Sequence, residues 1–321
     1  PQWHLDHFNI KIDEYVKHHD SHAAAGYFTS PFKETGATIL TVDAIGEWDT
    51  VSISTADKIW IERKETIKYP HSIGILYSAF THRCGLKPAE EEYILMGMAA
   101  YGEPKYKEDI YNDFVHQSPF KLKKNLHRGL SEWHPEADPM DLAASIQAVT
   151  EECLAGLWHR ASKYGSRNLV YAGGVALNCV ANGRLLREGP FDNIWIQPAS
   201  GDAGSALGAA LVAWHQHCHQ PRHCTGRDAM QGAYLGPCFS NDEICSYLNS
   251  QEAPFNSYED GPLFETVAGL LEQGKVVGWL NGRMEFGPRS LGARSILGDP
   301  RSQAMQSVMN LKIKYRESFR P

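Results

Sequence analysis

The sequence predicts an α/β fold, because short β-branched segments alternate with glycine-bearing turns and helical stretches. Residues 37–43, "ATILTVD", are apolar and β-branched and end in an acid, and "TVSISTADKIWIERKETIKY" then alternates as a strand or hairpin does. Further along, "NLVYAGGVALNCVANGRLL" and "NIWIQPASGDAGSALGAALVAW" each predict a short strand, a glycine turn and a helix. Two such units in succession are typical of α/β architecture.

A long amphipathic helix is expected from Asp141, which is a good N-cap residue. The apolar positions that follow recur at helical spacing and are Leu142, Ile146, Val149, Cys153 and Leu157. We expect this stripe to pack in the core rather than to hold a cofactor.

The chain is expected to form two domains. Residues 215–232 are polar and histidine-rich without apolar periodicity, which predicts a linker between a domain at 1–214 and a second one at 233–321. The second domain should contain a helix around "LFETVAGLLEQG", the strand "KVVGWL" and the loop "NGRMEFGPRSLGARSILGDPR".

Composition excludes several classes of protein. The 321 residues carry a net charge of -7, which argues against a broad nucleic-acid interface. No apolar run approaches the length of a membrane span and no cleavable signal opens the chain, so we expect a cytoplasmic protein without a membrane partner. The seven cysteines form no CxxC pair, which predicts reduced thiols rather than a disulfide framework or a zinc finger.

A metal site is predicted around "VKHHDSHAAAGYF", because on a helix His18 and His22 share one face. A metal of octahedral preference also needs carboxylates, and the best placed are Asp43 at a strand end and Asp202 in "SGDAG". This nitrogen and oxygen set suits iron or manganese better than structural zinc. The alternative is that the histidines pair with Asp20 or are satisfied in the core.

Two glycine-bearing turns, "AGGVALN" (172–178) and "ASGDAGSALG" (199–208), lie between a strand and a helix. Backbone N–H groups and helix N-termini in such turns can hold phosphates, so two of them in one domain suggest a nucleotide. Neither turn has a Walker or a GxGxxG sequence. The alternative is that the glycines only permit tight turns and close packing.

The loop "GRMEFGPRSLGARS" (282–295) predicts an anionic substrate, because guanidinium groups bind oxyanions at two points and hydroxyls complete such a pocket. The candidate residues of this arginine loop are Arg283, Arg289, Ser290, Arg294 and Ser295. Solvated surface arginines are the alternative.

Taken together and in this order, these segments resemble the O-carbamoyltransferase family of nodulation and antibiotic-tailoring enzymes. The motifs that carry the resemblance span nearly the whole chain and are "HHDSHAAAGYFTSPF", "LTVDAIGEWDT", "SIGILYSAFT", "EEEYILMGMAAYG", "AGGVALNCVANGRL", "PASGDAGSALGAAL" and "GRMEFGPRSLGARSILGDPR". The resemblance implies a ribonuclease-H/actin-like (Kae1-like) α/β domain followed by part of a YrdC-like α/β domain.

The resemblance also implies an activity. Carbamoyl phosphate and ATP would give a carbamoyl-adenylate, and the carbamoyl group would pass to a hydroxyl of a small-molecule acceptor. The implied cofactors are ATP and a divalent metal, iron first, with manganese, magnesium or zinc as alternatives. Carried over onto this chain are the metal ligands His18, His22, Asp43 and Asp202, the nucleotide-binding residues Gly173, Gly174, Val175, Asn178 and Gly201, and the arginine loop as the carbamoyl-phosphate site.

His19 is the candidate for the group that removes the acceptor's proton, because a neutral imidazole near the metal could act as a base. Ile94 stands where the family commonly has lysine, which puts one charged contact near the nucleotide or substrate in doubt. The family's opening strand pair does not precede residue 1, and its second domain continues beyond residue 321. We therefore expect a chain truncated at both ends, which could bind metal without turnover.

Two other functions stay open. A related enzyme of the Kae1 or hydrogenase-maturation type would carbamoylate tRNA or a thiol. Binding tRNA would require a basic face, and the thiol-modifying type would be expected to carry CxxC pairs. The sequence supplies neither. A non-catalytic nucleotide-binding module of the same fold is the third candidate.

Overall fold

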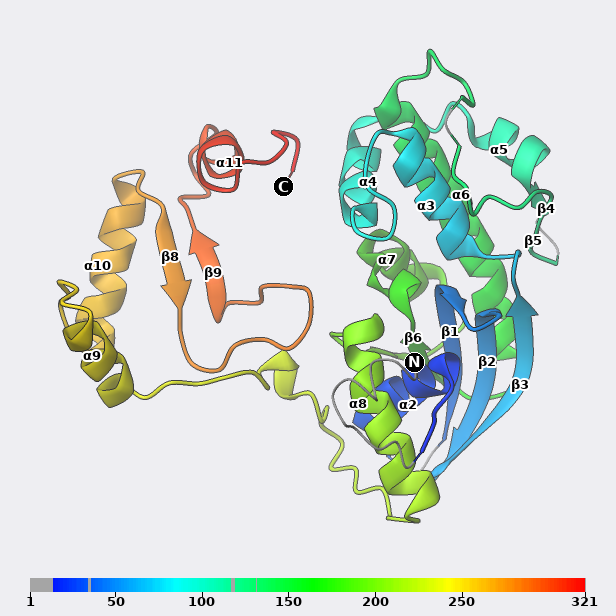
Figure 1. The fold of residues 1–321 in the computed structure, drawn as a ribbon, viewed down its shortest axis with the longest axis horizontal. Coiled ribbons are helices and arrows are strands. Elements are labelled where there is room, and N and C mark those ends of the chain that lie inside the picture. The colour runs from blue at the N-terminus through cyan, green and yellow to red at the C-terminus, as the bar shows by residue number, and fades with distance from the viewer. Residues whose placement is uncertain (1–13, 34–35, 117–118, 131, 321) are drawn as a thin grey trace, which may run out of the picture. The chain divides into compact units, whose positions relative to one another are not determined.

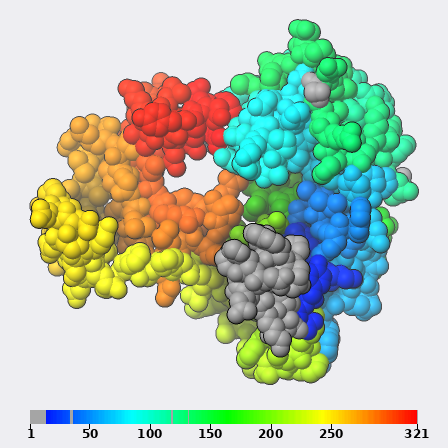
Figure 2. All heavy atoms as spheres, viewed as in Figure 1, coloured from blue at the N-terminus to red at the C-terminus, as the bar shows by residue number. Residues whose placement is uncertain are grey.

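The computed structural model describes residues 14–33, 36–116, 119–130 and 132–320 (Figure 1). The chain divides into two compact units, residues 1–229 and 230–321. Figure 2 draws the same units as spheres, with the first in blue to yellow-green and the second in yellow to red. Residues 1–13 of the predicted first domain lie outside the described residues.

The first unit is built on one mixed sheet with the strand order β3-β2-β1-β6-β7. The first three strands pair antiparallel, whereas β6 pairs parallel with both β1 and β7. The strands are β1 (Ala37–Gly46), β2 (Asp49–Asp57), β3 (Trp60–Lys68), β6 (Asn168–Ala172) and β7 (Asn193–Ile196). The predicted α/β class is therefore confirmed, as are the strand at 37–43 and the hairpin after it.

Helices cover both faces of this sheet (Figure 1). On one face, α2 (His18–Thr29) packs against α8 (Asp202–Val212) and buries Tyr27 beside Ile39. On the other, Leu157 of α6 (Pro139–Ser162) shares a small cavity with Val51. Strand β1 is almost entirely buried because it lies between these two layers.

The described residues of the first unit also form shorter elements. They are α3 (Ile73–Arg83), α4 (Glu92–Met98), η1 (Ala99–Tyr101), α5 (Lys107–Phe114), β4 (Val115–His116), β5 (Lys121–Leu122), η2 (Gly174–Leu177), α7 (Cys179–Glu188) and η3 (Ala213–His217).

Helix α6 begins before Asp141, so the predicted N-cap is wrong. Asp138 is the N-cap and accepts the backbone N–H of Met140 at 2.8 Å, and a proline follows it at the first helical position, where proline is favoured. Asp141 lies in the first turn and accepts the backbone N–H of Glu103 at 2.9 Å. The predicted apolar stripe is confirmed as core, because its residues are buried.

The unit boundary falls inside the predicted linker, and most of that segment belongs to the first unit. His215 is buried and its ring stacks on Phe28 at a centroid distance of 4.3 Å. Arg222 donates to the carbonyls of Phe32, Tyr27 and Ser30, and so satisfies acceptors at the C-terminal end of α2. The polar residues of this segment thus bind the first unit rather than water alone.

The second unit contains the predicted helix and strand. Strand β8 (Val277–Leu280) pairs antiparallel with β9 (Arg294–Leu297), and the predicted helix is α10 (Asp260–Glu272). The other elements are η4 (Gln231–Ala233), α9 (Asn241–Ser250), α11 (Met305–Ser307) and η5 (Val308–Ile313). Among the helices of the described ranges, none is long and apolar enough to span a bilayer.

Helix α2 lies close to its neighbours because glycines occupy the contact points. A Cβ atom on Gly208 of α8 would lie 1.8 Å from the carbonyl oxygen of Ser21. On α2 itself, a Cβ on Gly26 would lie 2.5 Å from Cγ1 of Val170. Neither approach is open to a residue with a side chain.

Gly208→Ala should therefore lower the free energy of unfolding by about 1–3 kcal/mol, because α8 must move away from α2. The measurement is urea unfolding followed by circular dichroism. The matched control is Gly156→Ala on exposed α6 surface, where nothing lies within 4 Å of the added Cβ and helix propensity favours alanine. Equal stability of the two variants would contradict the close packing.

Candidate functional site

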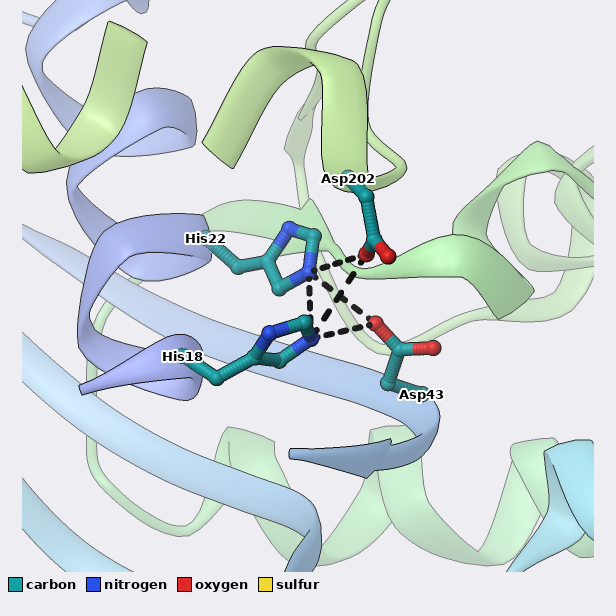
Figure 3. A group of neighbouring side chains, drawn as sticks. All are labelled: His18, His22, Asp43 and Asp202. Carbon is teal, nitrogen blue, oxygen red and sulfur yellow. Dashed lines mark hydrogen bonds and ion pairs between the residues drawn. The ribbon is translucent and has the colours of Figure 1, made fainter. Parts of the chain in front are cut away.

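Four side chains converge where the sheet's parallel strands end (Figure 3). Asp43 lies near the C-terminal end of β1, and Asp202 is the first residue of α8, shortly after β7. His18 and His22 come from the first two turns of α2. The carboxyl ends of parallel strands are where α/β proteins bind ligands.

The donor atoms of these side chains are close together. Nε2 of His18 and Nε2 of His22 are 3.0 Å apart, and they lie 3.2 and 3.0 Å from Oδ2 of Asp43. Oδ1 of Asp202 lies 3.6 Å from Nε2 of His18 and 3.4 Å from Nε2 of His22. The structure thus brings together all four residues predicted as metal ligands.

These separations fit one ion. Donors at about 2.1 Å from a metal are about 3.0 Å apart in adjacent octahedral positions and about 3.4 Å apart in tetrahedral ones. Two imidazoles and two carboxylates are also the donor types that first-row transition metals accept. The four residues therefore have both the spacing and the chemistry of a metal site.

The four side chains differ in exposure. The side chain of His22 is 1% exposed and that of Asp43 is 12% exposed, whereas that of His18 is 24% and that of Asp202 is 78% exposed. Solvent therefore contacts the cluster chiefly at Asp202 and also at His18.

Asp43 is held by its own strand. Its Oδ1 accepts the backbone N–H of Ala44 at 2.7 Å, which leaves Oδ2 facing the two histidines. A Cβ on Gly174 would lie 3.1 Å from the same Oδ1, so the first glycine turn passes directly beside this carboxylate.

Interactions within the cluster shift the pKa values of Asp43, His22 and Asp202. Burial alone would raise the pKa of Asp43, but hydrogen bonds with His18 and His22 outweigh it and lower that pKa well below its usual range. Burial would lower the pKa of His22, but Asp202 and Asp43 raise it to about 9. The pKa of Asp202 is lowered, chiefly by its hydrogen bond with His22.

Asp20 does not pair with the histidines, which was the alternative arrangement. Its carboxylate binds the guanidinium of Arg63, which also binds Asp49. The negative charge next to the histidine pair on α2 is thereby neutralised from the sheet.

His19 points elsewhere. It is 1% exposed, its Nδ1 lies 3.1 Å from Oγ of Ser52, and its Nε2 is buried without a hydrogen-bond partner among the described residues. Burial lowers the pKa of His19 to about 4, so the ring is neutral. It is not one of the four converging donors, and its role as a base stays a prediction.

The two glycine turns lie side by side. The backbone N–H of Gly173 donates to the carbonyl of Ser200 at 3.0 Å, which ties the first turn to the second next to Gly201. Gly173 has a φ of +92°, and a Cβ there would lie 2.2 Å from the carbonyl oxygen of Val42. Glycine is thus required at this position by both backbone conformation and close approach.

Asn178 has a structural role that sequence reasoning missed. Its Oδ1 accepts the backbone N–H of Ala181 at 3.1 Å and so caps α7. Its amide also pairs reciprocally with that of Gln147, at 3.1 and 3.0 Å, and Tyr77 donates to the same Gln147 at 2.9 Å. Gln147 could have been noticed as a polar residue within the apolar half of a core helix.

Ile94 lies in the core rather than at the site surface. It is 1% exposed on α4, which packs against α6. Ile94 therefore contributes to the packing of α4 in the core.

The arginine loop in the second unit uses much of its polar capacity internally. Arg294 donates to the carbonyls of Glu285 and Gly287 at 3.0 and 2.8 Å, and Ser290 contacts Ser295 at 2.9 Å. Buried Glu285 accepts the backbone N–H of Leu291 at 2.7 Å and that of Ala293 at 2.8 Å, which closes the loop.

The other two arginines face outward. Arg283 is exposed and donates one hydrogen bond, to the carbonyl of Gly236 at 3.1 Å, while Arg289 is exposed on the same loop. Arg283 and Arg289 are thus exposed to solvent, whereas Arg294 hydrogen-bonds within the loop, and the role of the loop in binding an anion stays a prediction.

Comparison with known proteins identifies the family. The chain matches the family described as carbamoyltransferase N-terminus over residues 6–211, and carbamoyltransferase C-terminus over residues 268–321. It belongs to the carbamoyltransferase family.

Relatives of the chain include an uncharacterized protein of Synechocystis sp., which is 50% identical over 95% of this chain and 54% of its own length. Nodulation protein NolNO of Sinorhizobium fredii is 32% identical over 98% of this chain and 48% of its own length. The chain thus spans about half the length of the curated relatives it matches. A solved structure, T. kodakarensis HypF, aligns with 68% of this chain and 38% of its own at 14% identity, with a TM-score of 0.40.

The interactions within the cluster predict an elevated pKa for His22 in metal-free protein. After chelation, NMR titration of the imidazole should give a pKa near 9, and Asp202→Asn should lower it, because one of the two carboxylates is lost. Since this pKa exceeds the ordinary 6.5, the stability from protonated His22 is fully present below pH 6.5 and is lost as the pH rises through about 9. Titration at or below 6.5 would contradict the arrangement.

Proposed function

We propose that this chain is the metal- and nucleotide-binding part of an ATP-dependent O-carbamoyltransferase. The observation that carries the proposal is the cluster of His18, His22, Asp43 and Asp202 beside two adjoining glycine turns, in a chain of the carbamoyltransferase family. The first unit would be a ribonuclease-H/actin-like lobe, which its mixed sheet supports, and the second the start of a YrdC-like domain.

The proposed metal is a divalent ion held by these four side chains, with iron or manganese favoured by the mixed donor set. Once bound, it would act as a Lewis acid that orients phosphate and carbonyl oxygens. Buried Asp43 and His22 would fix the position of the ion, and Asp202, which is mostly exposed, would lie on the side of the substrate.

The nucleotide would lie along the two glycine turns. Helix α8 begins directly after Gly201, and the first backbone N–H groups of a helix suit phosphate oxygens because they lack i−4 acceptors. The N–H of Gly204 already donates to the carbonyl of Gly201 at 3.0 Å, so the N–H groups of residues 202 and 203 are the candidates. Gly173 and Gly174 allow the chain to pass close to the cluster, so a phosphate bound there would also be near Asp43. Asn178 would act by holding this turn in place rather than by touching the nucleotide.

The proposed reaction has three balanced steps. Water and carbamoyl phosphate give carbamate and phosphate, and the carbamate oxygen then attacks the α-phosphate of ATP, which releases pyrophosphate and forms carbamoyl-adenylate. A hydroxyl of a small acceptor attacks the carbamoyl carbon, AMP leaves, and the hydroxyl proton goes to a base or to water.

Arg283 and Arg289 would bind the carbamoyl phosphate, because their guanidinium groups are exposed on the arginine loop.

The metal site is tested by metal analysis. Wild-type protein reconstituted anaerobically with Fe²⁺ should retain about one ion per chain in plasma mass spectrometry, and the His18→Ala/His22→Ala double variant should retain almost none. His159→Ala, which changes an exposed histidine on α6, should bind like the wild type. Equal metal content in all three proteins would exclude the four residues as the site.

The reaction is tested by pyrophosphate release. A full-length enzyme that contains this chain should release pyrophosphate from ATP only when carbamoyl phosphate is present, and Asp43→Asn should reduce the rate about 100-fold, because a metal-binding carboxylate is lost. Pyrophosphate release that ignores carbamoyl phosphate would contradict the proposed donor. Release that requires tRNA or a thiol would indicate one of the alternative acceptors.

A further inference from the structure

The turn between β1 and β2 lies against the first turn of α2, where His18 is located. This turn comprises residues 46–48, hereafter the β1–β2 turn, and it is closed by pairing of Gly46 with Asp49. It is not among the residues predicted as ligands, yet two of its residues contact His18.

Gly46 forms the surface on which the His18 side chain rests. A Cβ atom at Gly46 would lie 2.3 Å from Cδ2 of His18, 2.6 Å from Cγ and 2.7 Å from Cβ. Carbon atoms do not approach so closely, so any side chain at this position must displace the imidazole. The same imidazole places Nε2 between 3.0 and 3.6 Å from the three other donors.

Glu47 holds the backbone of His18. Its Oε1 accepts the backbone N–H of His18 at 3.3 Å and the hydroxyl of Tyr15 at 2.6 Å. The N-cap residue of α2, Lys17, supplies no side-chain cap, so this acceptor comes from the sheet. A carboxylate at a helix N-terminus is also electrostatically favourable.

We propose that the β1–β2 turn, through Gly46 and Glu47, positions His18 for metal binding. Gly46 fixes where the ring lies, and Glu47 fixes where the helix begins. The inference rests on the metal site proposed above, and it assigns the turn as a second layer of residues around that site. Such outer residues usually change metal affinity by about 10–100-fold when they are replaced.

The glycine is required by the imidazole and not by the conformation of the turn. Gly46 does not have a positive φ, so its backbone conformation is compatible with alanine. The atoms that block a Cβ there all belong to His18. The effect of Gly46→Ala should therefore act through His18.

The experiment measures metal binding without turnover. Mn²⁺ affinity is measured by electron paramagnetic resonance, and the visible absorption of Co²⁺-loaded protein reports ligand geometry. Gly46→Ala should weaken Mn²⁺ binding about 10–100-fold and change the Co²⁺ spectrum. Glu47→Ala should weaken binding about tenfold, and Glu47→Gln, which keeps an acceptor oxygen, should restore most of it.

Two controls separate positioning from a general structural role. Gly156→Ala, on exposed α6 surface, should leave both readouts unchanged. In a His18→Ala background, Gly46→Ala should add little further weakening, because the displaced ring is already gone. Circular dichroism checks that each variant is folded, and the Glu47 pair keeps the test valid if Gly46→Ala does not fold.

Wild-type affinity and an unchanged Co²⁺ spectrum in folded Gly46→Ala would overturn the inference while leaving the metal site in place. Equal weakening by Gly46→Ala with and without His18 would also overturn it, because the effect would not pass through the ring. Failure of the wild type to bind either ion would overturn the metal site and this inference together.

Discussion

The close packing of helix α2 is the constraint on which the rest of the site depends. A glycine lies at three of the contacts between α2 and its neighbours. Gly26 of α2 faces Val170, Gly208 of α8 faces Ser21 of α2, and Gly46 of β1 faces His18 of α2. A helix held a few tenths of an ångström farther out would carry its histidines away from Asp43, whose position is fixed by the sheet. The imidazoles reach the strand ends because the lack of a side chain at these three glycines lets α2 lie close to its neighbours.

That packing also creates an electrostatic problem that the cluster itself solves. Asp43 is nearly buried, and an unpaired carboxylate there would be costly. Both histidines supply compensating hydrogen bonds and His22 also supplies charge without a metal, and the ring nitrogens can act as ligands when they carry no proton. A metal ion and protons therefore compete for the same donor atoms. Asp20 is not one of these donors, because its carboxylate is paired with Arg63.

The sequence was sufficient for features whose rules are local or follow from the sheet. The HxxxH spacing placed His18 and His22 on one helix face, and strand ends placed Asp43 and Asp202 near each other, because parallel strands end at one edge. Contacts between distant segments could not be predicted in this way. The Gln147–Asn178 amide pair, the packing of Arg222 on the end of α2 and the inward use of Arg294 each join residues that no pattern connects.

The two carboxylates of the cluster differ in a way that sets the direction of approach. The carboxylate of Asp43 accepts the backbone N–H of Ala44 and lies against the first glycine turn, so its position is fixed. Asp202 is the first residue of α8, and its side chain is mostly exposed to solvent. Its carboxylate can therefore exchange a histidine for water or another ligand without being desolvated. In the nucleotide site that we propose, a phosphate along the glycine turns would approach the cluster from the side of Asp202, its most exposed member, while Asp43 and His22 keep their geometry.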